Sequence, residues 1–100
     1  MLDPVVAAMK GDLKVLKRVG KRNPRSLHFD DANGWRPLHE AVRAGHVEAV
    51  KFILSEGADI NQVTKTGVSP LNIALEYLGK HHKMTKFLAK NGGENIHPEL

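Results

Sequence analysis

One stretch of this chain decides its fold: DANGWRPLHEAVRAGHVEAVKFILSEGADIN, from Asp31 to Asn61. It opens with Asn33-Gly34, a dipeptide that favours tight turns because both residues tolerate left-handed backbone angles. Pro37 follows where its fixed backbone angle suits the first residue of a helix. We therefore predict a turn and then a short helix from Leu38 to Ala44.

The second half of the stretch predicts another helix. Gly45-His46 ends the first helix, and an amphipathic segment then runs from Val47 to Glu56, where Gly57 stops it. Apolar residues recur in this segment at helical spacing and form one packing face: Val47, Val50, Ile53 and Leu54. The stretch as a whole is thus a turn followed by a pair of short helices.

The same residue types recur 33 residues further along the chain. The residues Gly34, Pro37, Leu38 and Ala41 return as Gly67, Pro70, Leu71 and Ala74. A fixed period of about 20–50 residues is typical of stacked repeat proteins, in which each unit buries its apolar face against its neighbours. The sequence therefore predicts a solenoid of helix pairs.

The central unit also resembles a known family, the ankyrin repeats. The matching residues are Gly34, Pro37-Leu38-His39, Ala41, Gly45-His46, Glu48, Val50-Lys51, Leu54 and Gly57-Ala58-Asp59-Ile60-Asn61. The resemblance implies an all-α solenoid of stacked helix-turn-helix units joined by hairpin-like loops, or fingers. It divides the chain into a single ankyrin-repeat domain, residues 1–94, with repeats at about 3–30, 31–63 and 64–94, and a tail, residues 95–100.

The two outer units are edited copies, which we expect to act as caps of the stack. In the first, a helix begins at Asp3-Pro4 and ends at Gly11, and Asn23 takes the left-handed position that Gly57 holds in the centre. In the third, two extra residues fall within Tyr77–His82, before a second helix from Lys83 to Lys90. We expect the inserted segment to be a polar loop.

Composition fits a single small domain of 100 residues with 41% hydrophobic content. There is no cysteine, no apolar run long enough for a membrane helix, and no secretory signal pattern at the start. We therefore expect an intracellular protein, cytoplasmic or nuclear, that does not bind membranes and is a monomer.

Catalytic and metal-binding patterns are missing from the sequence. It has no phosphate-binding glycine motif, no His-Glu-x-x-His and no Gly-x-Ser-x-Gly. The adjacent His81 and His82 would point in different directions on a helix, and no acidic residue lies beside them at metal-ligand spacing. By the family resemblance, His39 and His46 brace neighbouring repeats through backbone hydrogen bonds. We predict a non-catalytic chain without a metal or cofactor.

The ankyrin resemblance implies that a protein partner binds the concave face, formed by the finger tips and the exposed ends of the first helices. Carried onto matching positions, this site comprises Lys10, Asn33, Trp35, Arg36, Arg43, Lys65, Thr66, Val68, Glu76 and Tyr77, with Met9, Ala32 and Ala44 beside them. We expect Trp35, Arg43 and Tyr77 to be the anchors, because Trp, Tyr and Arg dominate binding hot spots. Trp35 can also simply pack along its finger, and the insertion can redirect Tyr77.

Two other functions remain open at this point. Basic residues gather in the second helix of the first repeat and could bind nucleic acid through phosphates: Lys14, Lys17, Arg18, Lys21 and Arg22. No aromatic residues alternate with them to stack on bases, so a solvated cap face is the simpler interpretation. Alternatively, the chain is the targeting part of a longer enzyme.

Asn61 is a candidate for modification. In the family, the Asn that ends the Gly-Ala-Asp-x-Asn run is structural, and in some members it is hydroxylated. We expect the structural role here, with hydroxylation as a lesser hypothesis. Mass spectrometry of the Asn61 peptide from native material tests it, and consistent absence of an added oxygen atom would rule it out.

Overall fold

The computed structural model describes residues 3–98 and contains, within them, six α-helices and no strand. The helices are α1 Pro4–Lys10, α2 Leu13–Arg22, α3 Pro37–Ala44, α4 Val47–Ser55, α5 Pro70–Tyr77 and α6 Lys83–Lys90, with a 3-10 helix, η1, at Pro24–His28. The all-α prediction is confirmed. Residues 1–2 of the predicted domain and 99–100 of the predicted tail lie outside the described part.

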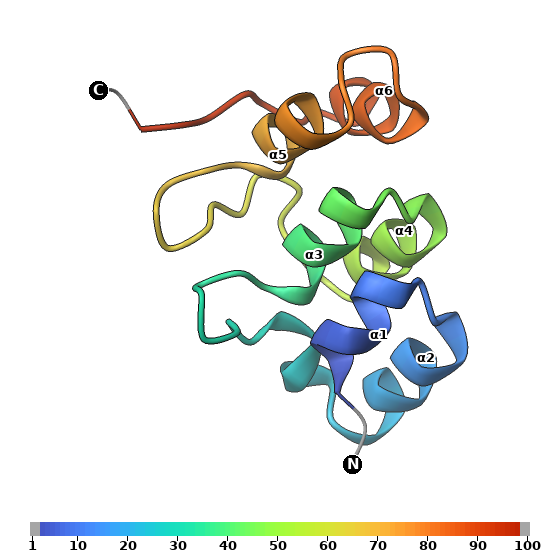
Figure 1. Cartoon of the computed structure of the whole chain (residues 1–100). Coiled ribbons are helices and arrows are strands. Elements are labelled where there is room, and N and C mark those ends of the chain that lie inside the picture. Colours follow the sequence, from blue (N-terminus) through green and yellow to red (C-terminus); the bar gives the residue numbers. More distant parts are fainter. Residues whose placement is uncertain (1–2, 99–100) are drawn as a thin grey trace.

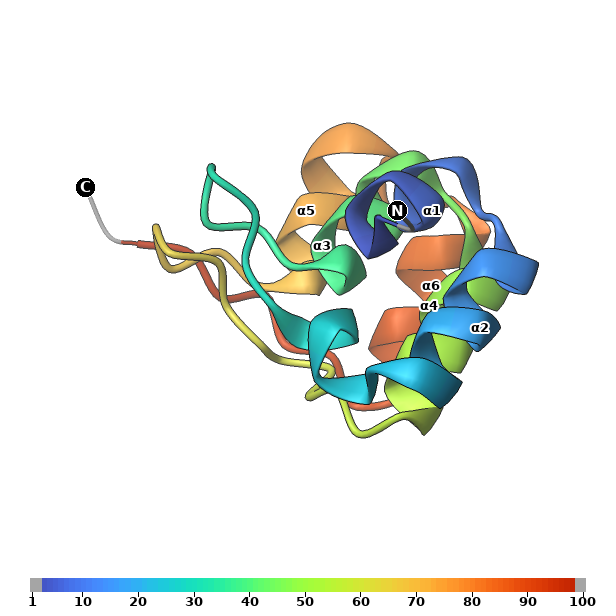
Figure 2. The ribbon, with the colours of Figure 1, turned by 90° about the horizontal axis from the view of Figure 1, so that it is seen from below.

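The helices form two layers. Figure 1 shows three helix pairs stacked in chain order, α1/α2, α3/α4 and α5/α6, with the loops between pairs projecting to one side. Seen along the stack, α1, α3 and α5 form one layer, and α2, α4 and α6 form the other (Figure 2). This is the predicted helix-turn-helix solenoid with fingers.

Prolines and small polar residues determine where α1, α3 and α5, which we call the inner helices, begin. Pro occupies the first position of α1, α3 and α5, where the missing N–H costs nothing. Asp3 and Ser69 cap α1 and α5 by accepting bonds from Val5 N (2.9 Å) and Asn72 N (3.2 Å). Arg36 supplies no such acceptor before α3.

The core consists of aliphatic side chains between the two layers. Ala8, Ala41 and Ala74 are fully buried, one in each inner helix, and their small size lets α1, α3 and α5 approach closely. Larger side chains fill the space between the layers, and these are also fully buried: Leu16, Val50, Ile53, Ile73, Met84 and Leu88. Each repeat thus buries its apolar face against the next, as a solenoid requires.

The end of the first repeat differs from the prediction. Asn23 has φ −150° and ψ 74°, so it is extended and not left-handed. Pro24 follows it, and a residue before proline is pushed towards extended angles by contact with the proline ring. The chain then forms η1, which places Leu27 in the core, fully buried.

Histidine side chains form contacts both within and between the repeats. As expected, His46 joins two repeats, because its Nε2 lies 3.0 Å from the Met9 carbonyl oxygen. His39 Nε2 lies 2.6 Å from the carbonyl oxygen of Gln62, which belongs to the same predicted repeat, so this bond holds the loop that leads into the third repeat. His28, which was not predicted, joins the first repeat to the second, with its Nε2 3.1 Å from the Glu56 carbonyl oxygen.

The interpretation of His82 as part of a polar loop was incomplete. Its Nδ1 accepts a bond from Met84 N (3.0 Å), which caps α6, and its ring lies next to Gly45, at the end of α3. His82 therefore occupies the place that His46 has one repeat earlier.

The chain after α6 is attached to the third repeat through Ser69, which is fully buried. Ser69 Oγ donates to the Glu94 carbonyl (2.6 Å) and accepts from Ile96 N (2.9 Å), and Ser69 N donates to the Ile96 carbonyl (2.8 Å). Asn72 adds a side-chain bond to Asn95 at 2.8 Å. Residues 94–96 are thus hydrogen-bonded to the start of α5.

We expect Ser69→Ala to lower the free energy of unfolding by about 2 kcal/mol, because a helix cap and two bonds to residues 94–96 are lost. Amide hydrogen exchange at Ile96 should accelerate in the same variant. Ser55→Ala is the matched control, since Ser55 Oγ bonds only the carbonyl of Phe52 in its own helix. Unchanged exchange at Ile96 in Ser69→Ala would contradict the attachment.

Candidate functional site: an aromatic and ion-pair cluster on the inner helices

Side chains from two repeats meet beside the fingers. Trp35 comes from the loop before α3, Arg43 from the last turn of α3, and Tyr77 from the last residue of α5. The Trp35 and Tyr77 rings lie edge to face, with centroids 6.3 Å apart, and the Arg43 guanidinium lies 5.9 Å from the Tyr77 ring centroid. The structure therefore brings together the three predicted anchors, although 42 residues separate Trp35 from Tyr77 in the chain.

These side chains surround a shallow hollow of about 280 Å³, which Asn33 and Glu40 also line. Tyr77 is 60% exposed and Trp35 is half-buried, so part of the aromatic surface around the hollow is open to solvent. The inserted loop after α5 does not turn Tyr77 away. Its ring faces Trp35 and Arg43.

Glu40 holds Arg43 in position. Two guanidinium nitrogens of Arg43, Nε and Nη2, donate to Glu40 Oε1 at 3.3 and 3.2 Å. Burial and the neighbouring Asp31 carboxyl raise the pKa of Glu40 above its ordinary value of 4.5, although Arg43 opposes this shift. The Glu40 side chain is largely shielded from solvent in this ion pair, because only 10% of it is exposed.

Asp31 shapes the finger that carries Trp35. Its Oδ1 accepts from Asn33 N (2.8 Å) and Trp35 N (3.0 Å), and its own N–H donates to the Trp35 carbonyl (2.6 Å). Burial tends to raise the pKa of Asp31, but the Trp35 and Asn33 N–H bonds outweigh it and leave the pKa below the usual 3.8. An ionised Asp31 therefore fixes the start of the finger.

The other predicted residues lie around this centre. Arg36 forms an ion pair with Asp30 at 3.2 Å, and its backbone N–H donates to His39 Nδ1 at 2.9 Å. Lys10, Asn33, Lys65, Thr66 and Glu76 are exposed, and Val68 is half-buried. Lys65 N also donates to the Gly34 carbonyl (3.0 Å), which joins the second finger to the first.

Glu40 and Val6 belong to this surface but were not predicted. Glu40 precedes Arg43 by three residues on one helix, a spacing at which opposite charges pair, so the sequence did contain the signal. Val6 and Met9 hold in α1 the places that Glu40 and Arg43 hold in α3, and they are 42% and 41% exposed. The inner layer therefore presents apolar residues at α1, an ion pair at α3 and an aromatic ring at α5.

The basic residues predicted on the first repeat are all exposed on α2: Lys14, Lys17, Arg18, Lys21 and Arg22. Within residues 3–98, none of them forms a salt bridge. Over the same range no three His, Asp or Glu side chains gather in a way that could hold a metal ion. No helix there is long and apolar enough to span a membrane.

Asn61 connects the second repeat to the third. Its amide nitrogen donates to the Gly92 carbonyl (3.2 Å) and to Glu94 Oε2 (3.3 Å), and its amide oxygen accepts from Glu94 N (2.8 Å). Both ends of the amide therefore have partners, which agrees with a structural role. Hydroxylation of Asn61 stays a hypothesis.

Comparison with known proteins agrees with this architecture. The chain is 37% identical to a mouse 2-5A-dependent ribonuclease over 70% of its length. It is 35% identical to a human NAD-capped RNA hydrolase over 86% of its length. A mouse protein phosphatase 1 regulatory subunit 27 is 42% identical over 65% of the chain. The chain spans 10%, 19% and 42% of the length of these relatives, respectively. The family model for ankyrin repeats, in three copies, matches residues 5–99, so this chain belongs to the ankyrin repeat family.

Proposed function

We propose that this chain is a non-catalytic protein-interaction module whose partner binds the concave face at Trp35, Arg43 and Tyr77. One observation carries the proposal: three side chains of the types that dominate hot spots converge from two repeats around one hollow. The names of two relatives, a regulatory subunit of protein phosphatase 1 and a Drosophila NF-kappa-B inhibitor called cactus, support an interaction role.

The arrangement suits binding because it is organised before a partner arrives. Glu40 holds Arg43, and Arg43 and Trp35 both lie against Tyr77, so few side-chain rotations remain to be lost on association. Val6 and Met9 extend the surface with apolar area on α1. A partner that places an apolar side chain in the hollow and others along α1 would bury most of this exposed apolar area.

The test is affinity capture from lysate of the source cells with three forms of the chain. We expect Trp35→Ala/Arg43→Ala/Tyr77→Ala to lose a partner that the wild-type chain captures, with Kd raised at least about tenfold for a partner anchored there. The control Glu48→Ala/Lys51→Ala/Lys86→Ala removes exposed side chains from the opposite layer and should keep that partner. Circular dichroism must show that both variants fold.

A partner that Trp35→Ala/Arg43→Ala/Tyr77→Ala retains and that the control variant loses would contradict this site.

A second proposal, that the chain is the targeting part of a longer enzyme, is supported by the names of two relatives. The chain matches 10% and 19% of the length of these two proteins. The length of the native polypeptide decides that proposal. The intracellular location and the monomeric state expected from the sequence also stay predictions.

A further inference from the structure

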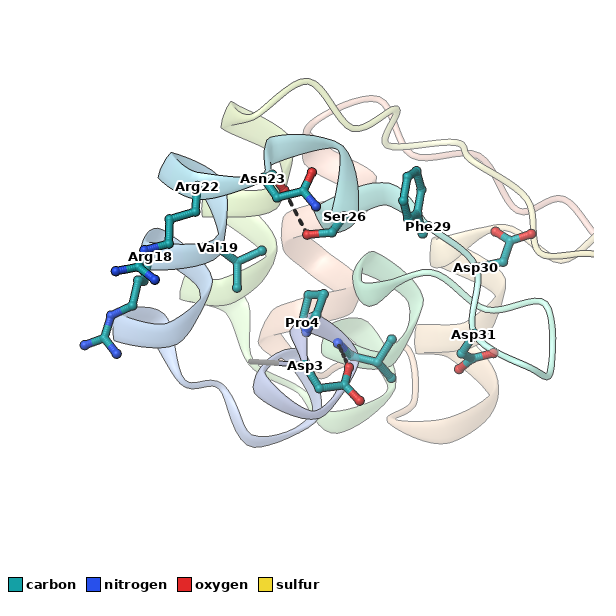
Figure 3. Close-up of a pocket in the computed structure, with 11 residues that line it drawn as sticks. Asp3, Pro4, Arg18, Val19, Arg22, Asn23, Ser26, Phe29, Asp30 and Asp31 are labelled. Carbon is teal, nitrogen blue, oxygen red and sulfur yellow. Dashed lines mark hydrogen bonds between the residues drawn. The ribbon is translucent and has the colours of Figure 1, made fainter. Parts of the chain in front are cut away.

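A second, larger hollow lies at the end of the stack, away from the concave cluster. It measures about 1170 Å³ and lies between α1, α2 and the segment after η1 (Figure 3). Its floor is mainly apolar, with Pro4 and Val5 from α1, Val19 from α2, and Phe29 from the chain after η1. Phe29 is 59% exposed, the second most exposed large apolar side chain after Tyr77 among residues 3–98.

This floor is unusual for the position that it occupies. Exposed surfaces of protein domains are normally built from polar and charged residues, with apolar residues scattered singly. The outer side of α2 follows this rule with its exposed Lys and Arg residues, but the hollow beside it does not. An exposed apolar floor with a charged border is the pattern of an interaction site.

The charges around the hollow are of two kinds. The acidic residues at its edge already have partners in this chain: Asp3 accepts from Val5 N, Asp30 pairs with Arg36, and Asp31 accepts from two finger N–H groups. The basic residues, Arg18 and Arg22, form no ion pair within residues 3–98. The hollow therefore has two borders of opposite charge. The unpaired guanidinium groups of Arg18 and Arg22 lie on the α2 side, and the carboxylates of Asp3, Asp30 and Asp31 lie towards α1 and the finger (Figure 3).

Arg18 and Arg22 also have a defined geometry. They are four residues apart on α2, so their side chains lie on one face, one turn apart, and Figure 3 shows both along the same border of the hollow. Two guanidinium groups at this spacing match two carboxylates that are one helical turn apart on a partner. Arginine is well suited to such pairs because its fork of N–H donors fits a carboxylate.

We propose that this hollow, which we call the end groove, binds an acidic amphipathic helix of another protein. The apolar face of the helix lies over Pro4, Val5 and Phe29, and carboxylates one turn apart pair with Arg18 and Arg22. The size of the end groove supports this occupant, because it exceeds the range of about 300–1,000 Å³ that is usual for small-molecule pockets. Nucleic acid fits less well, because phosphates would leave the apolar floor uncovered.

The probe is a fluorescein-labelled peptide of about 18 residues, long enough to form a helix, with Leu on one face and Glu on the other. Its binding to the whole chain is measured by fluorescence anisotropy. We expect Arg18→Glu/Arg22→Glu to raise the Kd at least about tenfold, because two charge-assisted pairs become repulsive. The matched control is Lys17→Glu/Lys21→Glu, which makes the same change of charge at the same spacing on α2, outside the groove lining.

The control variant should raise the Kd by less than about threefold, through the weaker general field alone. Phe29→Ala should also weaken binding, and the concave variant Trp35→Ala/Arg43→Ala/Tyr77→Ala should not, which separates this site from the proposed function. Several results would overturn the proposal: equal weakening by the two charge variants, no effect of Phe29→Ala, or equal binding of a Leu/Lys peptide. Stronger binding of duplex RNA than of the peptide, or concentration-dependent dimers that block the peptide, would also overturn it.

Discussion

Replacing His39 with Leu is expected to lower the free energy of unfolding by about 3 kcal/mol, because two hydrogen bonds to backbone groups are lost in the interior. His39 is fully buried, and its Nδ1 accepts from Arg36 N while its Nε2 lies 2.6 Å from the Gln62 carbonyl. The first bond satisfies the Arg36 backbone N–H at the start of α3. The second joins α3 to the loop that leads into the third repeat. Leucine fills similar space but satisfies neither backbone group.

The same residue should make stability depend on pH. Burial lowers the pKa of His39 below its usual 6.5, and Arg36 adds to this, although the bond to Gln62 opposes it. Below pH 6.5 the unfolded chain therefore binds more protons at this residue than the folded chain, and the free energy of unfolding falls as pH falls. Glu40 acts in the opposite direction, because its raised pKa makes its contribution decrease as pH rises above 4.5.

Urea unfolding at several pH values between 5 and 8 measures both effects. His39→Leu should be less stable at pH 8 and should lose less of its remaining stability between pH 7 and pH 5.5 than the wild-type chain. His81→Leu is the control, because it makes the same substitution at an exposed histidine and should leave the stability nearly unchanged. Parallel pH profiles of the wild-type chain and His39→Leu would contradict a buried neutral His39.

The second large effect is expected at Gly34. Its φ of 78° is a left-handed angle, and a Cβ added there would collide with the side chain of Lys65, whose backbone N–H bonds the Gly34 carbonyl. Gly34→Ala should therefore lower the free energy of unfolding by about 3 kcal/mol, the sum of the backbone cost and the displacement of the neighbouring finger. The position of Trp35 depends on the same finger.

Gly79→Ala separates the two causes. Gly79 has φ 90°, but a Cβ there would meet nothing within 4 Å, so only the backbone cost of about 1 kcal/mol applies. Thermal unfolding of both variants, followed by circular dichroism, measures the difference. Equal losses in the two variants would show that the fingers move apart without cost, and that their contact contributes nothing to stability.

The repeat period and the proline positions were sufficient to predict most of this fold. They located the turns and the first residues of the helices, because proline and glycine act on the backbone locally and need no knowledge of distant contacts. The family resemblance predicted backbone bonds from His39 and His46, and both form them, although the partner of His39 lies within its own repeat. It also selected Trp35, Arg43 and Tyr77, which the structure places in contact, while their role in binding stays a proposal.

Features that depend on pairs of distant residues could not be predicted. The bonds from Ser69 to Glu94 and Ile96 form only because the chain turns back after α6, and no local pattern indicates that return. The end groove arises because η1 brings Phe29 beside α1. His82 was missed for a different reason: the insertion shifts the repeat register, which hid its correspondence with His46.

The positions of the first and last described residues, Asp3 and Pro98, offer a way to observe the two surfaces separately. Pro98 lies beside Gly67, at the turn of the second finger, because residues 94–96 are bonded to Ser69. Asp3, at the other end, lies on the border of the end groove. A fluorophore attached near residue 98 would therefore sense a partner arriving at the fingers, and one near residue 3 would sense the occupant of the end groove. A chain that carries two dyes of different colour could report both events in one sample and reveal the order in which they occur.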